Sequence, residues 1–342
     1  MRRNVIVKLL VVALFVTSCL IALSPALTAD KVIKLRYSDF YPPSHKNSIL
    51  SREWANEIEK RTNNRINITY YPGETLTPAD QTYDSVVKGI ADIGQTVLAY
   101  ARGRFPLTEV IDLPLGYTSG YQATKMASAY YQKFRPKEFD DSKIMYIHAH
   151  GPGLIQTKEV IKSLDEVKGL RIKATGLSGK IVAALGGTPT TMTVVETYDA
   201  LQKGLADGVL LPIEVLKGWR LGELLKCTVK NYGISYSVGF GVFMNKEKWN
   251  SLPKDIQQVF EEVNREWIEK QGKLWDELDM GGEAFAAKMP GYTVVTATKD
   301  QETAAREKIK PLLDEYVENA KARGLPGDEV LKFCLDYLKT HP

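Results

Sequence analysis

The apolar residues of this chain switch repeatedly between the spacing of a strand and the spacing of a helix. Residues 33–38 and 66–71 alternate apolar and polar side chains, as half-buried strands do, whereas residues 48–61 carry apolar side chains three and four positions apart, as an amphipathic helix does. Further helices are predicted at 83–89, 178–185, 196–203, 303–323 and 331–338, and further strands at 91–94, 144–149, around Arg171 and at 207–211. Strands separated by helices predict an α/β protein in which helices cover the faces of parallel sheets.

The first residues have the composition of a secretory leader. A basic start precedes an almost wholly apolar stretch over residues 5–23, and small residues follow it. Cleavage after Ala26 or Ala29 fits the small-residue rule, and a lipoprotein box ending at Cys19 is the alternative. A retained membrane anchor competes with both, because the apolar stretch is nearly long enough to span a bilayer. We expect a signal peptide over residues 1–29 and an exported mature protein.

The longest predicted element is one amphipathic helix over residues 252–285. Pro253 marks its start, and Gly281 and Gly282 stand near its end. No low-complexity linker and no internal repeat interrupts the pattern of helices and strands. About 310 residues remain after the leader, which is ample for two packed lobes.

The net charge excludes some classes of partner. The full chain carries 45 Lys and Arg against 41 Asp and Glu, a formal charge of +4, but the leader holds Arg2, Arg3 and Lys8 and no acid. Its removal lowers the charge by three, to +1. A nearly neutral protein gives no support for a nucleic-acid partner or for binding to a bulk anionic surface.

Motifs that indicate an enzyme or a metal protein are absent from the sequence. There is no G-x-S-x-G elbow, no H-E-x-x-H, no P-loop and no Rossmann glycine pattern. The mature cysteines, Cys227 and Cys334, could pair in an oxidising compartment or stay as buried thiols, and no Cys-x-x-Cys pattern accompanies them. We therefore expect no catalytic residues, no metal and no cofactor.

The candidate binding chemistry centres on one short strand within residues 168–176. Alternate side chains of a strand share a face, so Arg171 and Lys173 point one way, and Leu170 and Ile172 point the other. Two neighbouring cations repel each other unless the protein or a ligand supplies an anion. A solvated edge strand is the alternative interpretation. We predict that Arg171 and Lys173 form the cationic end of a site for an organic anion.

Other candidates follow predicted strands, where ligands of α/β proteins bind. They are His45, Gln95, His150 and Glu214; Trp219 stands five residues after Glu214, and Phe240 lies in the expected crossover back to the first lobe, where it could cover the cleft. Alternatives stay open for most of them: His45 could cap the following helix, and Trp219 could belong to the core or form an aromatic wall. His148 and His150 share a face, but no third metal ligand is evident. Glu214 could balance one of the two cations or bind an amino group.

Several phrases of the sequence carry a resemblance to a known family. In chain order they are residues 54–60, 68–73, 87–94, 113–114, 168–173, 198–208, 244–249 and 252–253. Each phrase is weak alone, but their order and spacing are similar to those of the substrate-binding proteins of tripartite ATP-independent periplasmic (TRAP) transporters, DctP type. The resemblance covers essentially the whole mature chain.

The resemblance implies a fold and a function. The fold is a two-lobed α/β periplasmic binding protein with mixed sheets, crossing strands and a long helix that spans the lobes. The first lobe would hold residues 31–151 and 240–272, the second 152–239 and 273–325, and residues 326–342 would form a C-terminal helix or tail. Such a protein captures a small organic acid in the periplasm and delivers it, unchanged, to TRAP membrane permease subunits. An exported sensor module and an exported enzyme are the alternatives.

Four positions depart from the family's pattern. The family's carboxylate-binding arginine usually stands where this chain has Lys173, with a lysine at the place of Arg171, so which of the two is the main contact stays open. Well-studied relatives also place an arginine near Gly153 and an asparagine near Leu211. Without those two polar groups, the resemblance implies a ligand with one carboxylate and an apolar or aromatic body.

Overall fold

The computed structural model describes residues 32–341. The predicted signal peptide, its alternative cleavage sites and Cys19 lie outside these residues. From Lys34 onward the chain groups into one unit by its contacts. Within the described residues, no helix combines the length and the apolar character that a bilayer crossing needs.

The first sheet has five strands in the order β2-β1-β3-β10-β4. They are β1 Ile33–Asp39, β2 Ile66–Tyr71, β3 Ile93–Val97, β4 Ser142–Ala149 and β10 Gly239–Asn245. β1 runs parallel to β3, with Tyr37 opposite Ile93, whereas β10 runs antiparallel to both of its neighbours. Three helices pack on these strands: α2 Lys46–Arg61, α3 Thr82–Val87 and α4 Gly120–Phe134. The sheet is therefore mixed in direction.

The second sheet has six strands in the order β11-β9-β5-β8-β6-β7. They are β5 Gly153–Thr157, β6 Arg171–Ala174, β7 Thr188–Thr191, β8 Gly208–Pro212, β9 Cys227–Lys230 and β11 Thr293–Thr296. β6 runs parallel to β7 and β8, and β5 runs antiparallel to β8 and β9. The short helices α5 Ser178–Ala184, α6 Thr197–Gln202 and α7 Val215–Gly218 lie between these strands in the chain.

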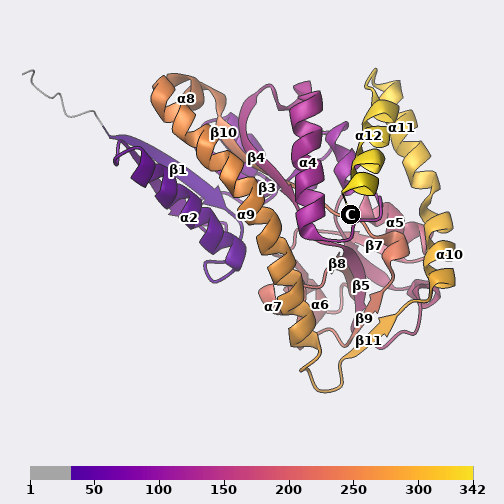
Figure 1. Ribbon diagram of the computed structural model, residues 1–342. Helices are drawn as coiled ribbons and strands as arrows, with labels where there is room; N and C mark the ends of the chain where they lie inside the picture. The colour runs from indigo at the N-terminus through magenta and orange to yellow at the C-terminus, as the bar shows by residue number, and fades with distance from the viewer. Residues whose placement is uncertain (1–31, 342) are drawn as a thin grey trace, which may run out of the picture. The chain divides into compact units, whose positions relative to one another are not determined.

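The chain passes between the two sheets three times. Residues 150–152 join β4 to β5, residues 231–238 join β9 to β10, and residues 246–292 join β10 to β11. The third connection holds α8 Lys246–Ser251 and α9 Lys254–Ala286, and α9 packs on α2, α4 and β4 of the first sheet and on α7 of the second (Figure 1). The two-lobed fold with a helix spanning both lobes is thereby confirmed, while the lobe boundaries stay a prediction.

Two features of the helices differ from the sequence-based expectation. The helix expected over residues 303–323 is two helices, α10 Lys299–Ile309 and α11 Pro311–Ala322, because Pro311 has no N–H for a helix interior and begins a new helix instead. α4, α7 and α8 have no counterpart among the predicted elements. The chain ends in α12 Gly327–Thr340, which packs on α4 and α11.

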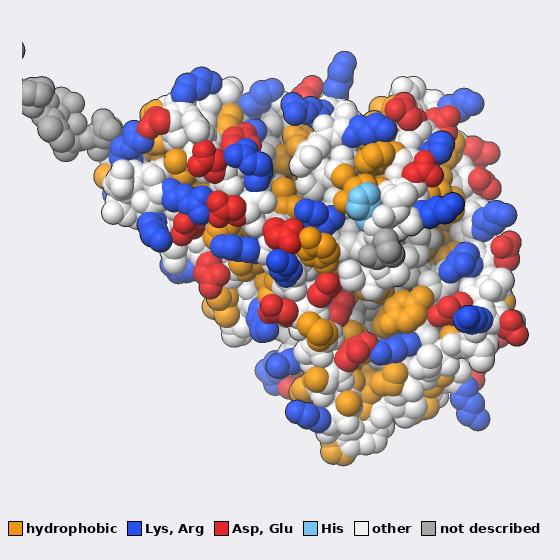
Figure 2. Space-filling model, in the orientation of Figure 1, with side chains coloured by type: hydrophobic (Ala, Val, Ile, Leu, Met, Phe, Trp, Pro, Cys, Tyr) orange, Lys and Arg blue, Asp and Glu red, His pale blue; other side chains and the backbone are white. Residues whose placement is uncertain are grey.

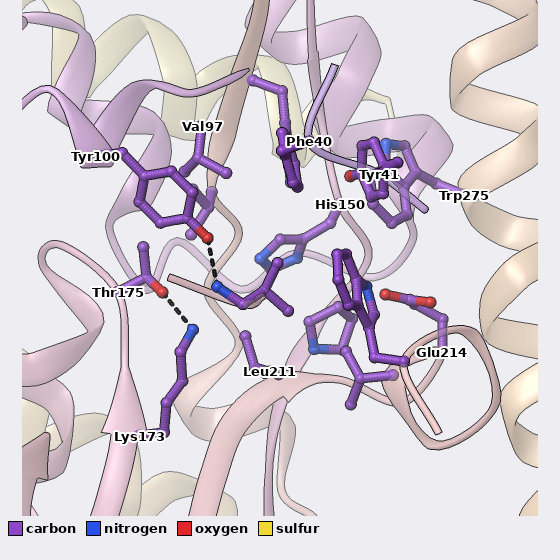
Figure 3. Close-up of a pocket in the computed structure, with 16 residues that line it drawn as sticks. Phe40, Tyr41, Val97, Tyr100, His150, Lys173, Thr175, Leu211, Glu214 and Trp275 are labelled. Carbon is purple, nitrogen blue, oxygen red and sulfur yellow. Dashed lines mark hydrogen bonds between the residues drawn. The ribbon is translucent and has the colours of Figure 1, made fainter. Parts of the chain in front are cut away.

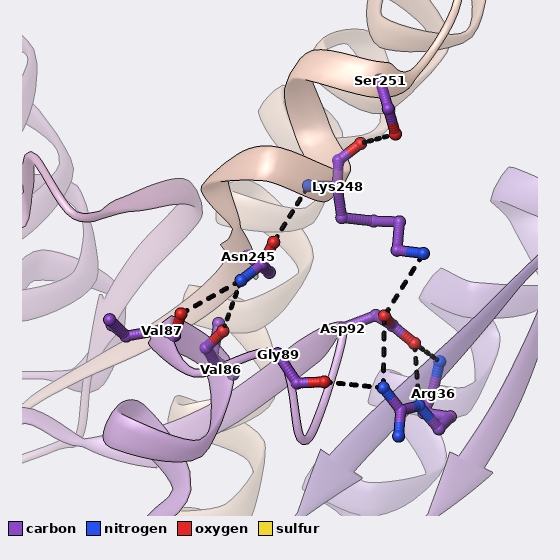
Figure 4. A network of polar contacts seen from close by, with 8 residues as sticks. All are labelled: Arg36, Val86, Val87, Gly89, Asp92, Asn245, Lys248 and Ser251. Carbon is purple, nitrogen blue, oxygen red and sulfur yellow. Dashed lines mark hydrogen bonds and ion pairs between the residues drawn. The ribbon is translucent and has the colours of Figure 1, made fainter.

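Two of the phrases that carry the resemblance meet in one polar network (Figure 4). The Asp92 carboxylate accepts from the backbone N–H of Arg36 at 2.8 Å and from its Nε at 3.0 Å, and it pairs with Lys248 Nζ at 3.7 Å. Asn245 accepts from the Lys248 N–H at 2.9 Å and caps α8, while its amide donates to the carbonyl of Val86 at 2.9 Å. These residues therefore join β1, the start of β3 and the end of β10 to α3 and α8.

Cys227 and Cys334 are both free thiols and both buried. Cys227 lies in β9 within the hydrophobic cluster of the second sheet, whereas Cys334 lies in α12 within the cluster around α4. Of the two states that the sequence left open, the structure has the unpaired one. Acidic and basic side chains are interspersed over the face seen in Figure 2, in keeping with the small net charge.

Candidate ligand-binding site

A cavity is lined by elements of both sheets (Figure 3). The loop after β1, the turn after β3 and β10 line it from the first sheet, and β6 and the end of β8 line it from the second. Trp275 of α9 also contributes. Six aromatic side chains form much of the wall: Phe40, Tyr41, Tyr100, Trp219, Phe240 and Trp275. The cavity lies beyond the carboxyl ends of β1, β3, β6 and β8, where ligands of α/β proteins bind.

Lys173 supplies the positive charge of the cavity. Its side chain is 0 % exposed, and Nζ donates to Thr175 Oγ1 at 2.7 Å. Among the described residues, Lys173 forms no ion pair with a carboxylate. Burial lowers the pKa of Lys173 to about 7, although the charge of Glu196 acts in the opposite direction. An ammonium in this position is stabilised strongly by any anion that reaches it.

Arg171, the second predicted cation, does not line this cavity. Its Nη2 lies 2.7 Å from Asp207 Oδ1, its Nε lies 3.0 Å from Oδ2, and its backbone N–H also donates to that carboxylate. Arg171 and Lys173 share a strand face, but they are about 7 Å apart along β6. Only Lys173 is at the end of the strand that opens on the cavity, and Asp207 holds the other cation at the surface.

His150 and Phe240, two further predicted residues, line the cavity. His150 Nδ1 lies 2.5 Å from the carbonyl oxygen of Gly151, and its Nε2 is buried without a hydrogen-bond partner among the described residues. The ring of Phe240 stacks on His148, with centroids 4.8 Å apart. His148 accepts from Trp275 Nε1 at 3.0 Å and belongs to the wall behind the cavity. Within residues 32–341, no group of side chains suited to a metal ion is found.

Glu214 and His45 meet at the side of the cavity. His45 caps α2, since its Nδ1 accepts from the N–H of Asn47 at 3.1 Å, and the opposite nitrogen, Nε2, lies 3.3 Å from Glu214 Oε2. A ring whose Nδ1 accepts carries its proton on Nε2, so His45 donates to Glu214. Glu214 lines the cavity and pairs with His45 instead of with either predicted cation.

Gln95 and Trp219 complete the predicted set. Gln95 lies in β3 away from the cavity, where its Oε1 accepts from the hydroxyls of Tyr37 and Ser51, each at 3.0 Å. Trp219 is half-buried and stacks on Phe40, with centroids 6.3 Å apart and an angle of 11° between the rings. Trp219 is therefore part of the aromatic wall, one of the two roles that the sequence left open.

Several lining residues were not among the sequence-based candidates, and they include Tyr100, Val194 and Trp275. The Tyr100 hydroxyl accepts from the backbone N–H of Val194 at 2.8 Å, which joins the turn after β3 to the segment after β7. Trp275 lies on the buried face of α9. The amphipathic pattern of a helix predicts that this face is buried, but it does not predict which residues contact it.

The two positions that lack the family's polar groups have different surroundings in the structure. A Cβ added at Gly153 would lie 1.9 Å from the ring of Tyr236, whose hydroxyl donates to the carbonyl of Leu210 at 2.6 Å. The aromatic ring thus fills the space that a side chain at Gly153 would take. Leu211 lines the cavity and adds apolar surface to it.

Comparison with known proteins identifies the family. The family model described as bacterial extracellular solute-binding protein, family 7 (DctP), matches residues 37–319. The chain belongs to this family. It is a TRAP substrate-binding protein, from a family of extracytoplasmic transport proteins and not of enzymes, and the family implies a periplasmic location.

Solved structures of TRAP solute-binding proteins are closely similar to this TRAP substrate-binding protein. One from Desulfovibrio salexigens is 35% identical, with 90% of this chain and 96% of that chain covered and a TM-score of 0.79. One from Rhodoferax ferrireducens, in complex with copurified benzoate, is 26% identical, with coverage of 90% and 98% and a TM-score of 0.85. One from an unidentified marine microbe, specific for aromatic acid ligands and bound to 3-hydroxybenzoate, is 28% identical, with coverage of 90% and 98% and a TM-score of 0.85.

Proposed function

We propose that this TRAP substrate-binding protein binds a small organic acid with one carboxylate and an apolar, aromatic body, and delivers it to TRAP membrane permease subunits. The observation that carries the proposal is Lys173, a buried ammonium at the end of an aromatic-walled cavity, whose only hydrogen-bond partner within residues 32–341 is the Thr175 hydroxyl.

The charged end of the ligand follows from Lys173. A carboxylate beside Nζ would turn an uncompensated buried charge into an ion pair from which water is excluded, where charge-assisted hydrogen bonds are strong. Thr175 could donate its hydroxyl to the same carboxylate. A second carboxylate on the ligand would lack such a partner, since Arg171 is held by Asp207 outside the cavity.

The body of the ligand follows from the walls. The aromatic side chains and Leu211 offer rings and alkyl groups in place of hydrogen-bonding groups. Each hydroxyl of a sugar acid that was buried here without a partner would cost a few kcal/mol, so a highly hydroxylated ligand is disfavoured. The benzoate and 3-hydroxybenzoate bound by two similar TRAP proteins support a ligand of this size and chemistry.

Contacts across the cavity support enclosure of the ligand between two lobes. Tyr100 accepts from Val194, His45 donates to Glu214, and Trp219 stacks on Phe40. In each pair, one residue belongs to the expected lobe of residues 31–151 and the other to that of residues 152–239. A ligand that contacts both lobes would favour the state in which these pairs are formed, and separation of the pairs would release it.

Thermal unfolding in the presence of a panel of acids tests the proposal. Benzoate and 3-hydroxybenzoate should raise the melting temperature in proportion to the logarithm of their concentration, because they bind the folded state only. Succinate, which has two carboxylates and no ring, and glucose, which has no charge, should raise it much less. Stabilisation by succinate or glucose with none by the aromatic acids would refute the proposed ligand class.

A further inference from the structure

His150 presents one unpartnered nitrogen to the cavity. The residue is 3 % exposed, it lines the cavity, and Figure 3 shows its ring in the middle of the site between Phe40 and Leu211. Its Nε2 is buried and has no hydrogen-bond partner among the described residues. Buried polar atoms of native proteins almost always have a partner, so this atom indicates where a ligand atom or a water binds.

Whether Nε2 accepts or donates a hydrogen bond depends on whether Nδ1, the other ring nitrogen, carries a hydrogen. Nδ1 lies 2.5 Å from the carbonyl oxygen of Gly151. A carbonyl oxygen only accepts, so Nδ1 carries a hydrogen and donates it. The pKa of His150 is lowered to about 4, chiefly by burial; the hydrogen bond to Gly151 acts in the opposite direction, and the charge of Lys173 contributes to the lowering. The neutral ring has one N–H, which is on Nδ1. Nε2 therefore carries a lone pair and accepts hydrogen bonds.

We infer that His150 is a hydrogen-bond acceptor for a ligand hydroxyl, so that the acid bound at Lys173 is a hydroxy-substituted aromatic monocarboxylic acid. This inference rests on the proposed function and names the ligand class more narrowly. The 3-hydroxybenzoate bound by a similar TRAP protein has both of these groups on one ring.

Other ligand groups fit this position less well. A carboxylate or keto oxygen placed at Nε2 would set one lone pair against another, which is repulsive. An ammonium would donate to Nε2, but it would share the cavity with the positive charge of Lys173. A hydroxyl donates without adding charge. It is the group that satisfies Nε2 and leaves Lys173 free for the carboxylate.

Calorimetry with two matched series of probes tests the inference. One series is benzoate, 3-hydroxybenzoate and 3-methoxybenzoate, and the other is phenylacetate, mandelate and benzoylformate. Within a series the acids differ chiefly in whether a hydroxyl, an acceptor oxygen or neither is present. The hydroxylated member of at least one series should bind about tenfold more tightly than its parent acid, and the methoxy or keto analogue should lose that gain.

The variant His150→Phe keeps a ring and replaces Nε2 by a C–H. It should bind benzoate and phenylacetate about as the parent protein does and should lose the tenfold gain for the hydroxylated acid. Arg171→Met, whose side chain pairs with Asp207 outside the cavity lining, is the control and should keep the gain.

The outcomes separate this inference from the proposed function. Binding of benzoate with no gain for a hydroxyl in either series, as a bound water at Nε2 would produce, overturns the role of His150 and leaves the proposed function standing. If the gain for the hydroxylated acid persists in a folded His150→Phe variant, the role of His150 is also overturned and the proposed function still stands. Failure of all six acids to bind refutes the proposed function itself. If the variant does not fold, nitrogen chemical shifts of His150 in the parent protein decide, and a hydrogen on Nε2 would overturn the inference.

Discussion

Replacing Lys173 by methionine removes the charge of the cavity and keeps most of the volume of the side chain. The buried ammonium is the only cationic side chain of Lys or Arg in the described cavity lining, and its hydrogen-bond partner there is the neutral Thr175 hydroxyl, whereas Glu214 already accepts from His45. The variant Lys173→Met should therefore lose the interaction with the ligand's carboxylate and keep the aromatic walls of the cavity.

The expected loss of binding is large. Removing one partner of a buried, hydrogen-bonded charge pair costs about 2–5 kcal/mol, which corresponds to a rise in Kd of about thirtyfold to several thousandfold. Arg171→Met is the matched control on the same strand. Its guanidinium is half-exposed and pairs with Asp207, so its loss should change Kd by no more than about twofold.

The same substitution should stabilise the ligand-free protein. The fall of the Lys173 pKa from 10.5 to about 7 means that burial of the ammonium destabilises the folded protein by at most about 5 kcal/mol. Below pH 7 the folded and unfolded chains both carry the proton, and the full desolvation cost opposes folding. Between pH 7 and 10.5 the unfolded chain binds more protons, so the free energy of unfolding of the parent rises with pH. The gain from Lys173→Met is thus largest at pH 6 and vanishes near pH 10.5.

Calorimetry with benzoate, together with denaturant unfolding of the ligand-free proteins, measures both effects. A variant that melts higher than the parent and fails to bind has lost the site and kept the fold. Unchanged benzoate affinity in Lys173→Met would show that the carboxylate binds elsewhere. If Arg171→Met alone failed to bind, the assignment of the two cations would have to be reversed.

Three further predictions concern protons, packing and closure. Above pH 7, benzoate affinity should fall about tenfold per pH unit, because the anion binds the protonated form of Lys173. Calorimetry at pH 8 in buffers of different ionisation enthalpy should detect uptake of about one proton. An affinity that does not change from pH 7 to 9 would contradict the role of the ammonium. Gly153→Ala should lower the free energy of unfolding by about 1–3 kcal/mol, because its Cβ would clash with a tyrosine ring, whereas Gly281→Ala, in open space within α9, should not destabilise; equal melts of the two variants would contradict this. Tyr100→Phe, which loses the acceptor for the Val194 N–H, should weaken benzoate binding by about fivefold to tenfold in calorimetry, and unchanged affinity would exclude a role for this bond in holding the closed state.

Sequence patterns predicted best the elements with a strong period. The apolar stripe of α9 continues for nine turns, so the prediction of 252–285 differs from the observed Lys254–Ala286 by one or two residues. β10 gave no such pattern, because every residue of Gly239–Asn245 is buried and an element covered on both faces does not alternate. α4 was missed although its buried residues Ala123, Met126, Ala127 and Tyr130 recur at helical spacing.

The candidate site divides in the same way between local pattern and long-range contact. Lys173 could be found from the sequence, because a cation on a short strand beside a glycine turn is a local feature. The position of Arg171 could not, because the carboxylate that holds it lies 36 residues away in the chain. Gln95 was expected to follow a strand, but it lies within β3, where the hydroxyls of Tyr37 and Ser51 hold its side chain in the first sheet.

By itself, the sequence determined the α/β class, the long helix and the cationic strand of this TRAP substrate-binding protein, because periodicity and charge are properties of neighbouring residues. Only the tertiary structure decided which side chains face one another across the cavity. Trp275 comes from α9, Tyr100 from the turn after β3, and Lys173 from β6, and no local pattern relates them. The position of the hydrogen on the His150 ring also depends on the tertiary structure. Burial keeps the ring neutral and the Gly151 carbonyl holds the hydrogen on Nδ1, which leaves Nε2 as an acceptor.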